Sequence, residues 1–273
     1  MRLIVTSQQD IAGVNIHNEL AKNFGFAAEG EFEGRSILKK GEVWAIATKK
    51  KQTEAEHLDE FFDAEYYVFA SRHRSESKTK TLTVHVTGNL TSKALVGGKP
   101  RQLAYCNPSA MKAALQELQR AKMQDYKVSM EATHHGPTGL KKPVLFVEVG
   151  STEVEWNDAG AVRAVAGAAL AAAGNRKEHE SAVGIGGSHY APKHTNVVLE
   201  SSIAIGHIIP SYAIDEIDRD IFAHAVEKSN AAFGFLDWKG MKKDQRDKVT
   251  ALAAELNLKL KRGRDLESTG MES

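Results

Sequence analysis

The sequence is poor in cysteine, and it has no long apolar run. Cys106 is the single cysteine among 273 residues, so an internal disulfide is excluded and a reducing compartment is expected. The first ten residues, MRLIVTSQQD, lack the apolar core and the small-residue cleavage site of a signal peptide. No apolar run approaches the length of a membrane span. These absences predict a cytoplasmic protein that does not interact with a membrane.

An excess of charge of either sign is also lacking. Lysine and arginine total 36 and aspartate and glutamate total 35, which gives a formal net charge of +1. The global basic field that dedicated nucleic-acid binders carry is therefore absent, although a phosphate contact needs only a local patch. Local lysine clusters occur at Lys39–Lys40, Lys49–Lys51, Lys141–Lys142 and Lys239 with Lys242–Lys243. For each cluster alone, a solvated surface is the simpler interpretation.

Apolar residues follow strand and helix patterns in alternation along the chain. A composition of 42% hydrophobic and 26% charged residues is that of an ordinary globular protein. The predicted strands are 3–5, 41–48, 65–70, 127–133, 144–149, 182–185, 202–209 and 234–237, and the predicted helices are 53–62, 154–173, 217–226 and 243–256, with two more beginning after Asp10 and Asn107. Strands separated by helices predict an α/β protein, a three-layer α/β/α sandwich with a largely parallel mixed sheet.

The domain organisation follows from the absence of a linker. No stretch rich in proline, glycine or serine divides the chain, so we expect a single α/β domain over residues 1–260, with an insertion near 71–106. Residues 261–273 are polar and are expected to form a flexible tail. Helix starts are marked by Asn107 before Pro108, and by Thr152 with Glu155 in the spacing of a capping box.

The eleven histidines differ in how strongly their sequence context indicates a functional role. Four of them fall on presumed helices or in polar loops, where a solvated or half-buried structural histidine is the better interpretation: His17, His57, His179 and His224. The others follow predicted strands or lie near their ends, which is where open α/β sheets bind their ligands. This placement indicates an active centre built from histidine.

The strongest local signal is the segment 131–138, EATHHGPT, at the end of a predicted strand. Adjacent residues on a regular strand point to opposite faces, so His134 and His135 can reach one site only if the strand has already ended. We expect one of them to act as a ligand or base and the other to be structural. Glu131 and both histidines are candidate catalytic residues, together with His85.

His85 lies between Thr83 and Thr87, whose hydroxyl groups face the same way along an extended segment and could fix its tautomer. Packing in the core is an equally open role for this histidine. The same ambiguity holds for His207, which lies next to a glycine near a predicted strand end.

A glycine turn at 184–187 also follows a predicted strand. Gly186 and Gly187 would let the backbone approach a ligand closely and would present free N–H donors. His189, Lys193 and His194 come immediately after the turn. A glycine loop alone is weak evidence, but these side chains favour a functional role for the segment.

Imidazole ligands supplemented by a carboxylate fit a divalent metal, most naturally zinc. The candidate ligands are His85, His134, His189, His194 and Glu148, with Glu131 as the alternative carboxylate. Zinc would lower the pKa of its bound water, which could attack an ester carbonyl while a glutamate or a free histidine takes the proton. Without zinc, a histidine-activated water and backbone N–H donors could perform the same reaction.

At these same segments the chain resembles the archaeal and plant type of D-aminoacyl-tRNA deacylase. The resemblance runs from residue 1 to about residue 260 and rests on Asn23–Phe26, Ala70–His73, His85–Asn89, Pro108–Lys112, Glu131–Thr138, Gly184–Gly187, His189–Lys193 and Asp237–Gly240. Several long motifs in order are far more specific than any one of them. Val84 and Ser188 stand where the family pattern leads us to expect threonine and glycine.

The resemblance implies hydrolysis of the ester between a D-amino acid and the 3′ end of tRNA, which proofreads and recycles mischarged tRNA. It further implies a phosphorylase/hydrolase-like fold, a zinc cofactor, and recognition of tRNA through its acceptor end. We expect Arg72, Lys193 and Lys239 to lie near the terminal phosphates; for each, an ordinary surface ion pair is the alternative. No stable protein partner is implied, and the protein is expected to be a monomer or a homodimer.

Two other functions remain open from the sequence. The chain could be a metal-dependent aminopeptidase or amidohydrolase of the same fold type, which would cleave small peptides. It could also be a tRNA-binding module without turnover, which would need the glycine turn and lysines but not the histidines. A comparison of a peptide, a D-aminoacyl-tRNA and its L-counterpart as substrates separates the three.

Overall fold

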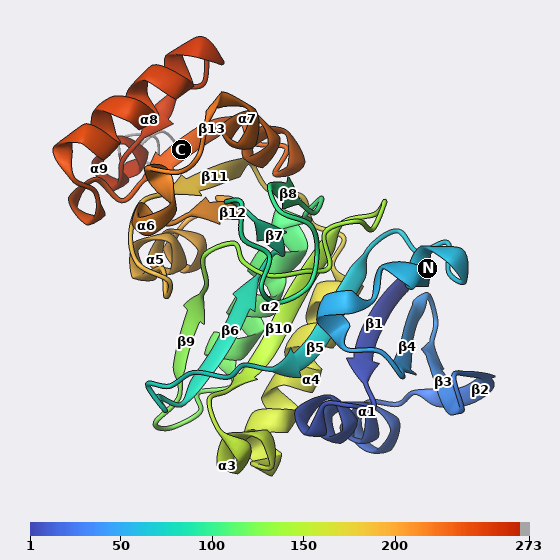
Figure 1. Cartoon of the computed structure of the whole chain (residues 1–273). Coiled ribbons are helices and arrows are strands. Elements are labelled where there is room, and N and C mark those ends of the chain that lie inside the picture. The colour runs from blue at the N-terminus through green and yellow to red at the C-terminus, as the bar shows by residue number, and fades with distance from the viewer. Residues whose placement is uncertain (268–273) are drawn as a thin grey trace.

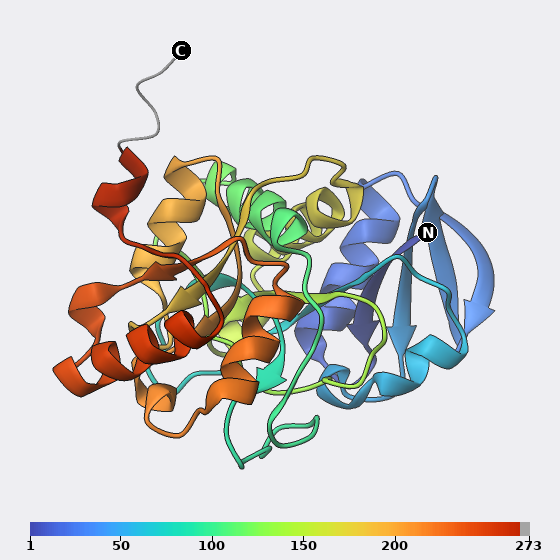
Figure 2. The same cartoon turned by 90° about the horizontal axis from the view of Figure 1, so that it is seen from above.

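The described residues build an eight-stranded and a four-stranded sheet, each with its own helices, which lie side by side in Figures 1 and 2. The computed structural model describes residues 1–267. The larger sheet has eight strands, in the order β2-β3-β4-β1-β5-β10-β6-β9. Its strands are β1 (Arg2–Ser7), β2 (Ala27–Phe32), β3 (Arg35–Lys40), β4 (Val43–Thr48), β5 (Tyr67–Arg72), β6 (Thr81–His85), β9 (Lys127–Met130) and β10 (Val144–Gly150).

The centre of the larger sheet is parallel. Strands β4, β1, β5 and β10 run in one direction, whereas β6 pairs antiparallel with β10 and carries β9 parallel to itself. The hairpin β2–β3 adds antiparallel strands at the other edge. The buried pattern of β10, in which all seven residues are buried, is that of a central strand covered on both faces. The predicted α/β class with a largely parallel mixed sheet is confirmed.

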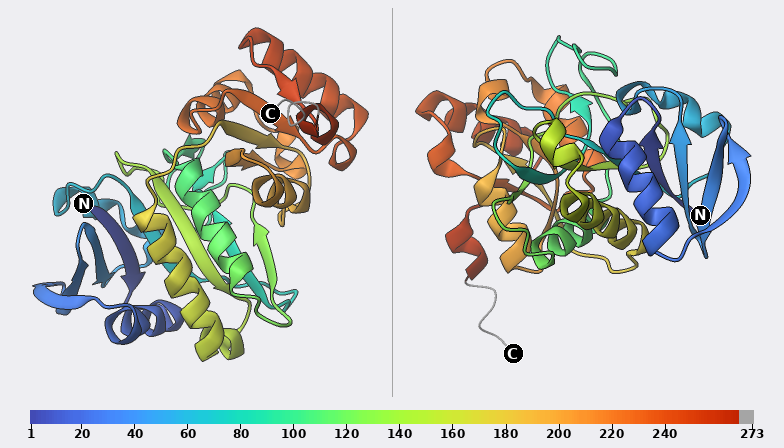
Figure 3. Two further views of the ribbon diagram at one scale, coloured as in Figure 1. Left: turned by 180° about the vertical axis from the view of Figure 1, so that it is seen from behind. Right: turned by 90° about the horizontal axis from the view of Figure 1, so that it is seen from below.

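Different layers cover the two faces of this sheet. Helices α1 (Ile11–Asn23), α2 (Pro108–Arg120) and α4 (Ala159–Gly174) lie side by side on one face, as the view from behind shows (Figure 3). Tyr66, which precedes β5, and Tyr67, its first residue, mark both sides, because successive residues of an extended segment point to opposite faces. The hydroxyl of Tyr66 donates to the Ala172 carbonyl in α4, whereas that of Tyr67 donates to Asp59 on the opposite side.

The predicted helix 53–62, which includes Asp59, is wrong. Residues 53–62 do not form a regular helix; they form two 3₁₀ helices, η1 (Gln52–Glu54) and η2 (Glu56–Glu60). Side-chain hydrogen bonds hold the segment to its surroundings, since Gln52 donates to the Ala70 carbonyl and Glu56 accepts from the Thr138 N–H. These anchors fix each turn separately, and short 3₁₀ turns suit such connections.

The predicted helix starts are confirmed. Asn107 caps α2 ahead of Pro108, and Thr152 with Glu155 forms a capping box. The predicted helix 154–173 is divided into α3 (Glu153–Trp156) and α4, because the Asp158 carboxylate accepts from two backbone N–H groups and starts a new helix. No helix in the described part of the chain has both the length and the apolar character needed to cross a bilayer.

The C-terminal third forms a second sheet that the sequence pattern did not separate from the first. Its order is β12-β11-β13-β14, and all its pairings are parallel. The strands are β11 (Ser181–Ile185), β12 (Ala204–Ile209), β13 (Phe233–Leu236) and β14 (Leu260–Lys261). They are accompanied by the helices α5 (Pro192–Glu200), α6 (Ser211–Ile214), α7 (Arg219–Lys228), α8 (Lys243–Glu255) and α9 (Gly263–Glu267).

Residue 261, where the predicted polar tail begins, is still part of a strand. A second apolar core, which contains Phe222 and Val249, lies in the C-terminal third, and Leu258 and Leu260 pack on it. Because β14 also pairs with β13, this part of the chain is held in the fold. Within the predicted tail, Gly263–Glu267 form α9, and residues 268–273 lie outside the described residues.

The two sheets share contacts rather than a linker. After β9 the chain crosses towards the second sheet, where the Ala132 N–H donates to the His189 carbonyl and the Thr133 N–H to the Ile208 carbonyl. The first apolar core extends over both sheets, because Ile205 and Phe233 of the smaller sheet belong to it together with residues of the larger sheet. Between β6 and α2, a long connection carries the small hairpin β7 (Gly88–Asn89) and β8 (Gln102–Leu103). We propose that residues 1–260 form one domain, with the insertion in this connection.

Truncation of Phe222 tests this proposal. Phe222 is fully buried in the second core, so Phe222→Ala is expected to lower the free energy of unfolding by about 3–5 kcal/mol. If the chain is one cooperative unit, Trp44 in β4 and Trp238 beside β13 lose their native fluorescence at the same denaturant concentration, measured in single-tryptophan variants. Separate transitions would show that each sheet folds alone.

Candidate active site

Five histidines and two glutamates gather in and beneath a pocket of about 530 Å³. The pocket lies on the face of the larger sheet that carries Phe146 and Glu148, and it includes the carboxyl ends of β1 and β5. We name this group the histidine–glutamate cluster. Its members are His73, His85, His134, His135, His189, Glu131 and Glu148.

Strands of the larger sheet supply three members of the cluster. Glu148 is in β10, where it stands level with Ser71 of β5, and the Ser71 hydroxyl donates to Glu148 Oε1 at 2.5 Å. His73 follows directly after β5, and His85 is the last residue of β6 and pairs with Phe146 of β10. Stacking of His85 on the Phe146 ring, with centroids 5.2 Å apart, fixes the imidazole over the sheet.

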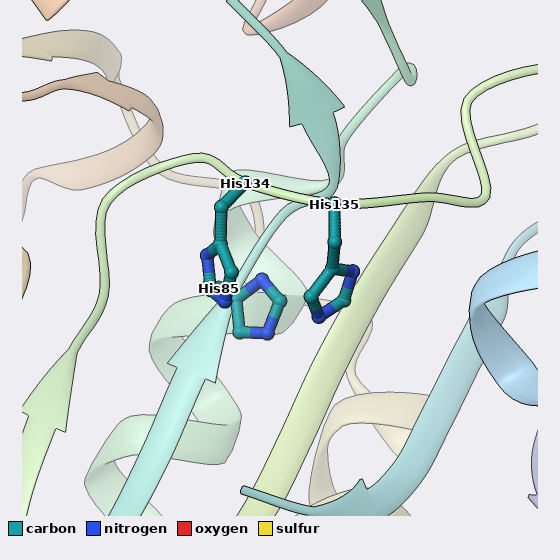
Figure 4. A group of neighbouring side chains, drawn as sticks. All are labelled: His85, His134 and His135. Carbon is teal, nitrogen blue, oxygen red and sulfur yellow. The ribbon is translucent and has the colours of Figure 1, made fainter. Parts of the chain in front are cut away.

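The segment after β9 supplies three more members. β9 ends at Met130, and His135 adopts a left-handed backbone conformation with φ 44°, which is uncommon for a residue with a Cβ and typical of functional sites. The strand has thus ended before His134 and His135, which allows both adjacent side chains to reach one site. Figure 4 shows the rings of His85, His134 and His135 turned towards one another, with ring centroids 4.2–4.8 Å apart.

Glu131 lies at the centre of the cluster. Its Oε2 is 3.2 Å from His189 Nε2 and 3.4 Å from His134 Nε2, and its Oε1 is 3.2 Å from His73 Nδ1. The carboxylate is fully buried, yet neither oxygen accepts a hydrogen bond of good geometry within the described residues. A buried carboxylate without such bonds is costly, which indicates that a further group is meant to bind it.

The tautomers of three histidines follow from their backbone contacts. The Nδ1 atoms of His85, His134 and His135 face the carbonyl oxygens of Val86, Ala132 and Gly136 at 3.3, 2.7 and 2.6 Å. Because a carbonyl oxygen only accepts, each Nδ1 carries a hydrogen, and a neutral ring of this tautomer presents an unprotonated Nε2. This tautomer, held by a backbone carbonyl, is that of a metal-ligating histidine. At His85, burial lowers the pKa, but the Glu148 carboxylate, 3.5 Å from Nε2, outweighs burial and raises it.

Burial and mutual repulsion keep two of these rings neutral. Burial, together with the neighbouring imidazoles of His85, His135 and His189, lowers the pKa of His134 well below its ordinary value. Burial and His85 lower the pKa of His135 to about 4. Both rings are therefore neutral at pH 7 and able to donate a lone pair.

His73, unlike His134 and His135, has a raised pKa. Burial by itself would lower its pKa, but the hydrogen bond to Glu148 and the charges of Glu131 and Glu148 raise the pKa of His73 to about 10. The same contacts outweigh burial at Glu148 and hold its pKa well below the ordinary value. The Tyr190 hydroxyl lies 2.8 Å from His73 Nε2 and fixes the other side of the ring.

The cluster fits a metal ion. His134 Nε2 and Glu131 Oε2 are both acceptors and face each other at 3.4 Å, an arrangement that repels unless a cation lies between them. Among residues 1–267, three groups of side chains could hold an ion with donor atoms within 4.8 Å of one another: His85 with His134 and His135, Glu131 with His134 and His189, and His73 with Glu131 and Glu148. Imidazole and carboxylate donors are those that zinc binds.

The structure brings together most of the residues that the sequence singled out, but not His194. Its ring is buried in the second sheet, where it packs against Gly184 and lies edge-on to Phe235. The reason is that α5 begins at Pro192 and turns this side chain inward. His207 is also structural, because its two ring nitrogens contact the Thr133 hydroxyl and the Ala104 carbonyl.

The glycine turn at Gly186 and Gly187 packs closely on the segment that follows β13. The Gly186 N–H is not free; it donates to the Ile209 carbonyl at 2.8 Å. Gly186 and Gly187 have φ values of 88° and 86°, and a Cβ at Gly186 would lie 2.8 Å from the Asp237 carbonyl oxygen. Glycine is thus needed for the close packing of this turn on the segment after β13.

The predicted phosphate-binding cations are divided between two places. Arg72 lines the pocket of the cluster together with Lys51 and Arg74, and its guanidinium lies over the Trp156 ring. Lys193 and Lys239 line a second pocket, at the carboxyl end of β13.

Sequence reasoning missed His73, Ser71 and Tyr190 as members of the site. A signal was present for His73, because it lies three residues after the predicted strand 65–70 and ends the Ala70–His73 motif. Tyr190 lies inside the His189–Lys193 motif, but its contact with His73 spans 117 residues, so the sequence does not show that the two side chains meet.

Fold and site together define an α/β enzyme of the hydrolase class, with a histidine–glutamate centre able to hold a metal ion. The family model for D-aminoacyl-tRNA deacylase matches residues 60–261. The chain belongs to this family, as its resemblance implied.

Curated relatives and a solved structure agree with this membership. A D-aminoacyl-tRNA deacylase of Pyrococcus horikoshii is 40% identical, with 94% of this chain and 98% of that protein covered. One of Methanosarcina acetivorans is 39% identical, with 98% and 95% covered. The crystal structure of a conserved protein of unknown function superposes with a TM-score of 0.90 at 34% identity, covering 98% of this chain and 97% of the other.

Proposed function

We propose that this protein hydrolyses the ester bond of D-aminoacyl-tRNA and releases the free D-amino acid and tRNA. The observation that carries the proposal is the buried Glu131 carboxylate, which three imidazoles approach within 3.2–3.4 Å without forming a good hydrogen bond, in a chain of the deacylase family. An aminoacyl ester is intrinsically labile, so a modest activation of water is sufficient for turnover.

We further propose zinc as the cofactor. Glu131, His134 and His189 are the residues that would hold it, and His85 and Glu148 are further candidate ligands beside them. A bound zinc ion would polarise the ester as a Lewis acid and would make water nucleophilic at neutral pH.

The chain's own residues contribute the proton transfer and the positioning. We assign to His135 the acceptance of the proton from water, because its Nδ1 is held by the Gly136 carbonyl and its Nε2 is unprotonated. His134 and His189 expose 27% and 35% of their side chains, so the ester can reach them from the pocket. Arg72, with Lys51 and Arg74 beside it, would hold the phosphate nearest the ester.

Selectivity for one hand of the α-carbon would come from the shape of this pocket. Only a D-amino acid would then place its ester carbonyl against the cluster. The protein would act in the cytoplasm, where charged tRNA is found, as a monomer or a homodimer without a stable protein partner.

Release of D-tyrosine from D-Tyr-tRNA tests the proposal, with L-Tyr-tRNA as the matched control. We expect D-selective release that is lost after treatment with a chelator and regained when zinc is restored. Release that resists chelation would contradict the metal and leave the histidines and backbone donors to activate water.

The alternative functions give different results in the same assay. A peptidase would cleave a small peptide and leave D-Tyr-tRNA intact, and a binding module would retain tRNA without releasing tyrosine. The family membership favours neither of them.

A further inference from the structure

A second pocket, of about 770 Å³, lies at the carboxyl ends of β13 and β14. Open parallel sheets bind their ligands at this end of the strands, close to the point where the strand order reverses. In the smaller sheet, β12 lies on one side of β11 and β13 on the other, so the strand order reverses beside this pocket. Its position is therefore that of a ligand site, separate from the histidine–glutamate cluster.

The pocket is richer in cations than in acids. Four basic side chains line it: Lys193, Lys239, Arg262 and Arg264. Glu200 and Asp237 are its acidic residues, and the Asp237 carboxylate accepts the Gly240 N–H. Because the whole chain has a net charge of only +1, this is a local concentration of positive charge.

Two of the cations are available for an anion. Lys193 and Lys239 are exposed, and within residues 1–267 neither has a carboxylate partner within salt-bridge distance. Arg264, by contrast, is 3.6 Å from Asp265. Exposed lysines without partners on the rim of a pocket are suited to phosphate groups.

Aromatic stacking organises a third cation. The Arg262 guanidinium lies 3.3 Å from the centroid of the Trp238 ring, and Arg246 lies 4.8 Å from the same centroid. Stacking on the indole holds the planar guanidinium in a fixed orientation at the pocket. A guanidinium held in this way can bond a phosphate with two N–H groups, or present its outer face to a base.

The two pockets are close along the chain. His189 belongs to the cluster and Lys193 lines the second pocket, so their Cα atoms lie no more than about 14 Å apart even if the four intervening steps are fully extended. A few nucleotides of an RNA strand cover that distance. One ligand could thus occupy both pockets.

We propose that the second pocket, through Lys193, Lys239 and Arg262, binds the phosphates of the RNA strand whose esterified 3′ end lies at the histidine–glutamate cluster. This inference rests on the proposed deacylase function and adds a division of labour. The second pocket recognises the RNA, and the first pocket performs the hydrolysis.

The double variant Lys193→Ala/Lys239→Ala tests it, with Lys22→Ala/Lys141→Ala as the control for an equal loss of charge. Lys22 and Lys141 are exposed and belong to the larger sheet's side of the molecule. For D-Tyr-tRNA we expect KM to rise about 10-fold in the test variant while kcat stays within twofold. The slope of log affinity against log salt should fall by about 1.4, which corresponds to two lost single-strand phosphate contacts.

A substrate without the RNA strand separates recognition from chemistry. Hydrolysis of D-tyrosyl-adenosine should be the same in the wild type and in the test variant. A wild-type KM and salt slope in the test variant would overturn the inference, as would an equal loss with the small ester. If the wild type hydrolyses neither substrate, the deacylase function fails, and binding of uncharged tRNA to the two double variants still decides the role of the second pocket.

Discussion

Replacement of Glu131 by glutamine is expected to lower kcat/KM for D-Tyr-tRNA by about 1,000-fold, measured in single-turnover and steady-state assays. Glutamine has nearly the same shape, but its amide has no negative charge and turns an N–H donor towards His73, His134 or His189. The cluster would then lack the carboxylate at its centre, whose oxygens lie 3.2–3.4 Å from those rings. We also expect zinc to bind at least about 10-fold more weakly, measured by metal titration.

Glu153→Gln is the matched control, because it makes the same chemical change at an exposed position on α3. Both variants should keep the circular dichroism spectrum of the wild type. If folded Glu131→Gln protein released D-tyrosine at the wild-type rate, Glu131 would not belong to the catalytic centre.

Truncation of His134 is expected to abolish turnover and to leave the fold intact. His134→Ala removes a ring that lies 3.4 Å from Glu131 and 4.2 Å, between centroids, from His85, so we expect a loss of about 10²–10⁴-fold in kcat. The ring is partly exposed, so its loss should not open a closed cavity in the core.

His224→Ala provides the comparison for this variant, since His224 is exposed on α7. It should retain wild-type activity and stability. Wild-type rates in folded His134→Ala protein would exclude the proposed centre. A loss of both activity and fold would assign His134 a structural role instead.

Local features of the fold could be predicted because short-range physics decides them. Asp10, Asn107 and Thr152 start helices through contacts with backbone N–H groups only two or three residues away. The continuous apolar run of β10 identified a central strand for a similar reason, since burial on both faces leaves no polar position. The second sheet was not separable in this way, because strand pairing joins distant segments.

The candidate site shows the same division. Residues 131–135 drew attention because two adjacent histidines follow a strand pattern and precede a glycine and a proline. His194 had an equally suggestive position beside Lys193, yet its side chain turns inward against Gly184 and Phe235 of the second sheet. Whether a histidine enters the cluster depends on the start of a helix one or two residues away, which the spacing in the sequence does not fix.

By itself, the sequence determined the α/β class, the helix starts, the family and six of the seven members of the histidine–glutamate cluster. These depend on composition, on local periodicity and on motifs that are contiguous in the chain. Only the tertiary structure decided that His73 and Tyr190 join the site, that Glu131 stands at its centre, and that Lys193 and Lys239 line a pocket of their own. Such contacts connect residues far apart in sequence, and the packing of two sheets against each other, rather than any local preference, sets their distances.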